Sequence, residues 1–204
     1  MKTKTSQTSL DKALLESAKA GDVDRVKDSL IAGADIHVQE DFALRWAAEN
    51  GHLEVVRMLL DCGADIHEGS DYALRVTSYN GCVELVRLLL DSGADIHAES
   101  DYALRRAAEN GRLEVVRILL ERGADIHAES DQAFRWAAEN GHLEVVNILL
   151  AHGADLEIGI KAAKDAGNIT ILGLLKRIKL SREEKKLLAA EVPGPESQGA
   201  RIRM

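Results

Sequence analysis

Apolar residues in this chain fall into short stripes with helical spacing, and glycines separate one stripe from the next. The first stripe of a typical segment has the i, i+3, i+4 spacing of one helix face and consists of Leu44, Ala47 and Ala48. The second stripe has similar spacing and consists of Leu53, Val56, Leu59 and Leu60. Asn50 and Gly51 lie between them, and both residue types tolerate the left-handed conformation that ends a helix. The segment therefore predicts two helices joined by a tight turn.

The two-helix pattern recurs with a strict period. Each copy ends in the motif Gly-Ala-Asp, which begins at Gly33, Gly63, Gly93, Gly123 and Gly153, 30 residues apart. A fixed period of this kind is typical of arrays in which each unit packs only against its neighbours. One helix pair cannot cover its own apolar stripes, so the sequence predicts an all-α repeat solenoid of about six stacked helix-turn-helix units.

The pattern also sets approximate boundaries. The predicted units span residues 9–37, 38–67, 68–97, 98–127, 128–156 and 157–180. Ser181 to Glu184 has the sequence of a capping box, which predicts a separate short helix over residues 181–191. Residues 1–8 and 192–204 are polar and lack periodicity, so both segments are predicted to be disordered.

Acidic and imidazole side chains recur once per unit before the first helix. The acidic residues are Asp41, Asp71, Asp101 and Asp131, and each stands where a carboxylate would cap the first helix. The histidines are His37, His67, His97 and His127. Stacked helices lie about 8–10 Å apart, whereas zinc ligands lie about 2 Å from the metal, so one histidine per unit does not predict a shared metal site. We expect these histidines to brace the loops through hydrogen bonds between repeats.

The motif that links the two stripes carries a resemblance to a known family. The stretch Asn-Gly-His-Leu-Glu-Val-Val-Arg from Asn50, with Gly-Ala-Asp-Ile from Gly63, resembles the ankyrin repeat family, and the resemblance covers residues 9–180. It implies paired helices and a protein-binding function. The family's Thr-Pro-Leu-His motif is absent and each unit is shorter than the usual ~33 residues, so the β-hairpin fingers should be shortened or absent. This short variant resembles the arrays of giant DNA viruses of amoebae, which implies a viral source.

Charge and composition narrow the range of partners. The chain has 26 basic and 34 acidic residues, and residues 1–157 alone carry 16 against 29. An acidic body repels phosphate backbones, so nucleic acid is not expected as a partner. No run of about 18 apolar residues and no signal-peptide pattern is present, which predicts a cytoplasmic protein without a membrane partner. Cys62 and Cys82 lack metal-binding spacing and are expected to be reduced thiols.

The sequence offers little material for catalysis. It has no nucleophile with a neighbouring histidine, no phosphate-binding glycine loop and no zinc-protease motif. The position of His52 is occupied by Cys82 and Arg112 in other units, which a catalytic base or a metal ligand would not tolerate. We therefore expect a protein that is not an enzyme and that needs no metal or other cofactor.

Arginine also recurs once per unit, at Arg45, Arg75, Arg105 and Arg135. Arg45 lies four residues from both Asp41 and Glu49, a spacing that favours ion pairs along a helix. The pattern predicts a solvated face on which these charges neutralise one another. Recognition of an acidic partner is the alternative.

Positions that differ between units can encode a partner, because shared positions build the scaffold. Most of the variation falls on one face of the first helices, which should form the concave side of the array. The predicted partner-binding residues are Phe42, Trp46, Tyr72, Arg75, Val76, Tyr79, Tyr102, Arg106, Gln132 and Trp136. Aromatic and arginine side chains are common in binding hot spots. The alternative is that Trp46 and Trp136 only cover the stack.

Unit 68–97 departs most from the others and is the predicted centre of the binding surface. It has Val76-Thr77-Ser78-Tyr79 where the neighbouring unit 38–67 has Trp-Ala-Ala-Glu. Tyr79 thereby removes an acid that elsewhere could pair with arginine. Neutral drift of this unit is the rival interpretation.

Three functions fit the sequence. The first is a monomeric protein-binding scaffold, acting as a viral or pathogen effector in the host cytosol. The second is an adaptor that recruits a host enzyme complex, such as a ubiquitin ligase, through the C-terminal segment. The third is a self-associating structural element, which the apolar residues Leu187 and Leu188 favour.

Overall fold

The computed structural model describes residues 4–191, and within that range it contains twelve helices and no strand. The helices are α1 Lys4–Ala20, α2 Val23–Ile31, α3 Val38–Glu49, α4 Leu53–Asp61, α5 Glu68–Asn80, α6 Val83–Asp91, α7 Ala98–Glu109, α8 Leu113–Glu121, α9 Ala128–Asn140, α10 Leu143–Ala151, α11 Leu156–Asp165 and α12 Ile169–Glu191. The predicted all-α solenoid with shortened or absent fingers is confirmed, because helix pairs stack without any hairpin in the described range.

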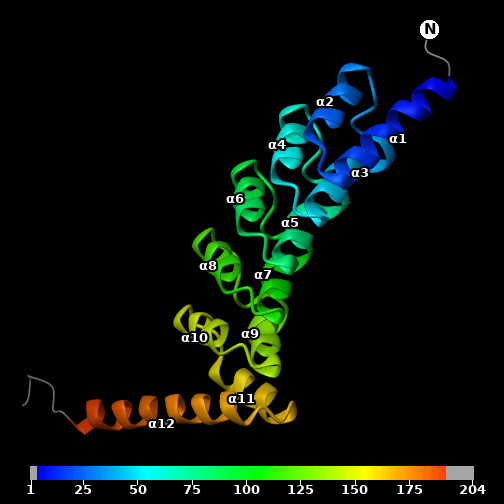
Figure 1. The fold of residues 1–204 in the computed structure, drawn as a ribbon. Coiled ribbons are helices and arrows are strands. Elements are labelled where there is room, and N and C mark those ends of the chain that lie inside the picture. The colour runs from blue at the N-terminus through cyan, green and yellow to red at the C-terminus, as the bar shows by residue number, and fades with distance from the viewer. Residues whose placement is uncertain (1–3, 192–204) are drawn as a thin grey trace, which may run out of the picture.

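The helices form two layers along a curved array (Figure 1). Odd-numbered helices pack against each other in sequence order, and the even-numbered helices α2 to α10 stand beside them as a second row. The odd row is packed more closely than the even row. Small residues on the first helix of each pair permit this close approach.

Alanine-rich stripes explain the tight row. On α3 the buried side chains are Asp41, Ala43, Leu44, Ala47 and Ala48, and on α4 they are Val55, Val56 and Leu59. Leu53 and Leu60 are half-buried. Both predicted stripes therefore face the core, where each fully buried Leu or Val contributes about 1.5–3 kcal/mol.

A left-handed turn precedes the helical part of α3, α5, α7 and α9. Gln39, Glu40 and Asp41 have φ values of 53°, 61° and 52°, and the three equivalent residues of the next three units behave in the same way. Residues other than glycine rarely adopt three such conformations in a row, because the left-handed conformation costs about 1–2 kcal/mol for each of them. This turn occupies the place of the β-hairpin finger. The apolar and polar pattern of the sequence does not predict this turn.

The ends of the array differ from the prediction in two places. Residues 4–8 belong to α1, where Gln7 donates to the Asp11 carboxylate and to the Gly33 carbonyl, so disorder was wrong for this part of residues 1–8. Residues 181–191 are the second half of α12, and a separate helix there was also wrong. No glycine or proline lies between Leu174 and Ser181, so the capping-box residues continue the helix. Residues 1–3 and the predicted tail 192–204 lie outside the described residues.

Candidate functional site

Buried aspartates join each unit to the next. The Asp41 side chain is 3% exposed, and its carboxylate accepts from the Asp65 N–H at 2.9 Å and from His37 Nδ1 at 3.1 Å. The predicted helix cap was wrong. The left-handed turn directs the carboxylate to the loop of the next unit, where it satisfies a backbone amide 24 residues away.

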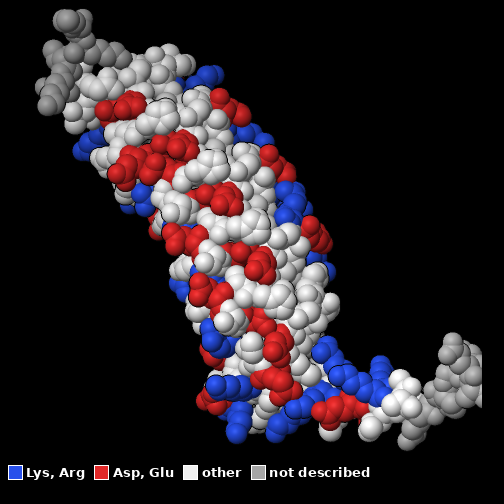
Figure 2. All heavy atoms as spheres, turned by 180° about the vertical axis from the view of Figure 1, so that it is seen from behind, with Lys and Arg blue, Asp and Glu red and all other residues white. Residues whose placement is uncertain are grey.

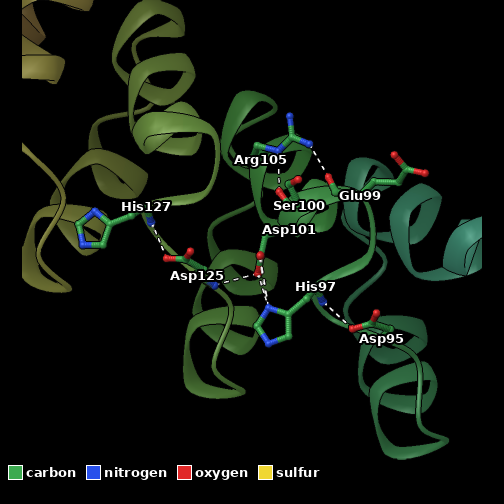
Figure 3. A network of polar contacts seen from close by, with 8 residues as sticks. All are labelled: Asp95, His97, Glu99, Ser100, Asp101, Arg105, Asp125 and His127. Carbon is green, nitrogen blue, oxygen red and sulfur yellow. Dashed lines mark hydrogen bonds and ion pairs between the residues drawn. The ribbon is translucent and has the colours of Figure 1, made fainter.

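The same joint recurs along the array. Backbone amides of Asp35, Asp95, Asp125 and Asp155 donate to the carboxylates of Asp11, Asp71, Asp101 and Asp131, at 2.7–2.9 Å. Figure 3 shows one such joint, with the Asp101 carboxylate between the His97 ring and the Asp125 amide. A hydrogen bond to a buried charged group is worth about 1.5–3 kcal/mol, so these joints stiffen the stack.

The histidines were expected to bond between repeats, and that detail was wrong. His37, His67, His97 and His127 each contact the aspartate four residues later in their own unit, and the aspartate makes the inter-unit bond. Hydrogen bonding to Asp41, aided by its charge, raises the pKa of His37 above 6.5.

Other side chains make direct bonds between repeats. They run from His52 to the Lys19 carbonyl, from Arg112 to the Tyr79 carbonyl and from His142 to the Glu109 carbonyl. Histidine and arginine can both occupy this position because each only has to reach one carbonyl of the preceding unit. The variation that argued against catalysis thus has a structural explanation.

Arg45, Arg75 and Arg105 stack on aromatic rings instead of pairing with acids. The Arg45 guanidinium carbon lies 4.5 Å from the Phe42 ring centroid and 4.6 Å from that of Tyr72. Arg75 lies 5.9 Å and 5.3 Å from the rings of Tyr72 and Tyr102. The predicted ion pairs of Arg45 with Asp41 and Glu49 were wrong, since neither forms within the described residues. Asp41 is engaged in the joint described above.

Backbone carbonyls of the left-handed turn hold two of these arginines in place. Arg75 Nη2 donates to the Gly69 carbonyl at 2.8 Å, and Arg105 donates to the carbonyls of Glu99 and Ser100 at 2.6 and 3.0 Å (Figure 3). Arg105 also lies 5.1 Å from the Tyr102 ring centroid and donates to Gln132 Oε1 of the next unit. We call this row the arginine–aromatic strip, and its members are Phe42, Arg45, Tyr72, Arg75, Tyr102 and Arg105. Each stacked contact is worth about 0.5–1 kcal/mol at an exposed site.

A pocket opens on the strip in unit 68–97. It has a volume of about 230 Å³ and is lined by Tyr72, Arg75, Val76, Tyr79, Tyr102 and Arg106. Arg106 lies over the rings of Tyr79 and Tyr102, at 5.2 and 5.4 Å from their centroids, and pairs with Glu109. Tyr79 is 42% exposed, which is unusual for a large ring on this face. The pocket combines aromatic walls with guanidinium groups, a composition suited to binding a side chain of mixed character.

Six of the ten predicted binding residues therefore lie together, and four lie elsewhere. Phe42 and Trp46 form an edge-to-face pair with centroids 5.4 Å apart, and Lys19 lies over Trp46. Gln132 ends the strip by accepting from Arg105. Trp136 is half-buried on α9, outside the pocket. Whether any of the ten contacts a partner stays a prediction.

Sequence reasoning missed the aspartate joints and the stacking. The separation of 24 residues between Asp41 and Asp65, repeated through the chain, was the available signal for the joints. This signal was overlooked because Asp41 was interpreted as the cap of its own helix, which gives the carboxylate a partner within the same unit.

Charge is unevenly distributed over the surface. Figure 2 shows acidic groups along the array on one face and basic groups gathered at its lower end, around α12. Residues 158–191 carry eight basic and four acidic residues. No helix within residues 4–191 has both the length and the apolar character needed to cross a membrane.

Comparison with known families gives one finding. The family model described as ankyrin repeats (3 copies) matches residues 14–100 and 77–159, which together span most of the solenoid. A comparison with curated proteins finds no match.

Proposed function

The chain belongs to the ankyrin repeat family, and from this premise we propose that it is a non-catalytic scaffold whose arginine–aromatic strip binds another protein. Ankyrin repeats generally mediate protein–protein interactions and are not an enzymatic fold. The pocket of unit 68–97 is the observation that carries the choice of surface. There, side chains of units 68–97 and 98–127 converge around an open hollow lined by three tyrosine rings.

Selection of a random peptide library on the immobilised chain tests this proposal. Peptides that bind should lose affinity by at least about tenfold, or ~1.4 kcal/mol, for the variant Val76→Trp/Tyr79→Glu, which restores the regular repeat sequence and fills the pocket. The matched control is Trp136→Val/Glu139→Tyr, which makes the reverse change on α9, away from the pocket. Unchanged affinity in the first variant would reject the proposal.

The biological setting belongs to the same proposal. The likeness of the 30-residue units to the arrays of giant DNA viruses supports an effector that acts as a monomer in a host cytosol and binds a host protein. Size-exclusion chromatography with light scattering tests the monomer, and a fluorescent fusion in infected amoebae tests the location. A stable dimer would favour the self-associating element instead.

One observation favours the adaptor as a second candidate. Residues 181–190 of α12 are all exposed, and this half of the helix extends away from the array (Figure 1). Leu187 and Leu188 are 67% and 65% exposed there. Capture of a ubiquitin ligase subunit by the chain, and its loss in Leu187→Glu/Leu188→Glu, would support the adaptor. Retained capture in that variant would contradict a role of α12.

A further inference from the structure

The pocket of unit 68–97 contains an arginine that forms no ion pair with any carboxylate of the described residues. Arg75 forms no ion pair within residues 4–191, and its Nε is buried without a hydrogen-bond partner. At the position where other units have Glu49, Glu109 and Glu139, this unit has Tyr79. Arg106, the other arginine that lines the pocket, is already paired with Glu109. The uncompensated positive charge in the pocket therefore belongs to Arg75.

The first-helix positions around the pocket carry a net positive charge although the body of the protein is acidic. Positions 45, 46 and 49 and their equivalents in units 68–97, 98–127 and 128–156 carry five arginines and three glutamates, a net charge of +2. Residues 1–157 as a whole carry −13. A partner polyanion would be repelled by the body, whereas a single carboxylate at the pocket would mainly feel Arg75, since charges beyond about 8 Å are screened at physiological salt.

The pocket walls add an apolar requirement. Tyr72, Tyr79 and Tyr102 contribute ring surface to the lining and Val76 contributes an aliphatic side chain. A large apolar group is therefore suited to displacing water from the hollow. The guanidinium of Arg75 keeps donors free beyond its bond to the Gly69 carbonyl, and a planar guanidinium fork matches a carboxylate. Both features lie within one pocket of about 230 Å³.

We propose that this pocket recognises a protein segment in which an aspartate or glutamate lies next to a large apolar side chain. The apolar side chain enters between the tyrosines, and the carboxylate accepts hydrogen bonds from Arg75. This inference rests on the proposed function and specifies the partner's chemistry. Charge complementarity between Arg75 and the carboxylate selects the partner, and the ring surface provides most of the buried area.

Peptides selected on the full chain provide the probe. Each is synthesised in three forms, with its acidic residue retained, changed to the matching amide and changed to lysine, and the Kd of each is measured by calorimetry. We expect about tenfold weaker binding for the amide form, since a charge-assisted bond is lost, and weaker binding still for lysine. With Arg75→Gln the acidic and amide forms should bind equally. Arg135→Gln, at the same helix position two units further on, is the control and should keep the full difference.

The outcomes separate the two proposals. Selected peptides whose binding depends on Val76 and Tyr79 could carry no acidic residue, or could bind equally well as amides. Either result would reject recognition of a carboxylate, while the proposed protein-binding scaffold would remain supported. If the acidic peptides still bound more tightly than their amide forms to the Arg75→Gln variant, Arg75 would not be the residue that recognises the carboxylate. Peptides that bind independently of the pocket would overturn both. Arg75→Lys keeps the charge without the planar fork, so it should discriminate against the lysine peptides even if Arg75→Gln folds poorly.

Discussion

Units 68–97 and 98–127 are neighbours with the same loop conformation and different helix faces. In both, a left-handed turn places an aspartate against the next unit, with bonds of 2.7 Å from Asp95 to Asp71 and 2.8 Å from Asp125 to Asp101. On the first helix, however, Thr77, Ser78 and Tyr79 stand where unit 98–127 has Ala107, Ala108 and Glu109. The difference teaches that the loops maintain the stack while the helix face is free to vary.

That freedom has a structural cost in the core. Thr77 Oγ1 donates to the Ala73 carbonyl at 2.8 Å, which satisfies it, but Ser78 Oγ is buried without a partner. An unsatisfied buried hydroxyl costs about 1–3 kcal/mol. The pocket thus lies in a unit whose core is less well satisfied than that of its neighbour.

The largest effect is expected from a substitution that removes the aspartate joint, which both units share. Asp101→Ala should lower the free energy of unfolding by about 3 kcal/mol, because it leaves the Asp125 amide unpaired and puts alanine in a left-handed conformation. Asp71→Ala should cost the same. Urea unfolding followed by circular dichroism measures both losses.

Asparagine provides the control for this prediction. Asp101→Asn retains an acceptor for the amide and tolerates the left-handed conformation, so it should cost only about 1 kcal/mol. If the alanine variants of the two units differed severalfold, the loops would not be equivalent scaffolds.

Exchanging the residues at the equivalent positions 78 and 108 tests whether the cores of the two units differ in stability. Ser78→Ala should stabilise the protein by about 1 kcal/mol, and Ala108→Ser should destabilise it by about 1–2 kcal/mol. Both are seen as shifts of the urea midpoint. Thr77→Ala is the control, since removing a satisfied hydroxyl should change stability little. Equal effects of Ser78→Ala and Thr77→Ala would contradict the assignment of the cost to Ser78.

The smallest expected effect is the pH dependence of stability that arises from His37, the histidine partner of Asp41. The pKa of His37 is raised in the folded state by its hydrogen bond to Asp41, with Asp35 and Asp65 adding to the effect, so protonation stabilises the fold. This contribution is complete below the unfolded value of 6.5 and is lost as the pH rises through the raised folded pKa. The Tm difference between the wild type and His37→Gln should therefore be positive near pH 5 and shrink above neutrality. A difference that grows with pH would reverse the sign and refute the pairing.

Much of the candidate site could be anticipated because variation between units reports directly on side chains. Tyr72, Arg75, Tyr79 and Tyr102 were grouped from their helix positions alone, and they meet in one pocket. Their stacking was not anticipated. The i, i+4 spacing predicted ion pairs between Arg45 and acidic residues of its own helix. In the structure, one of the two aromatic rings that Arg45 stacks on, Tyr72, belongs to the next unit.

The sequence by itself determined the paired helices of the array and their order, because apolar spacing, glycines and a 30-residue period act locally and repeat. Only the tertiary structure decided where Asp41 and Arg45 find their partners. Asp41 lies in the left-handed turn of three residues, and Arg45 lies in the helix that follows it. Their partners, Asp65 and Tyr72, are 24 and 27 residues away in the next unit. Spacing along one helix carries no information on such contacts, which exist only once neighbouring units have stacked.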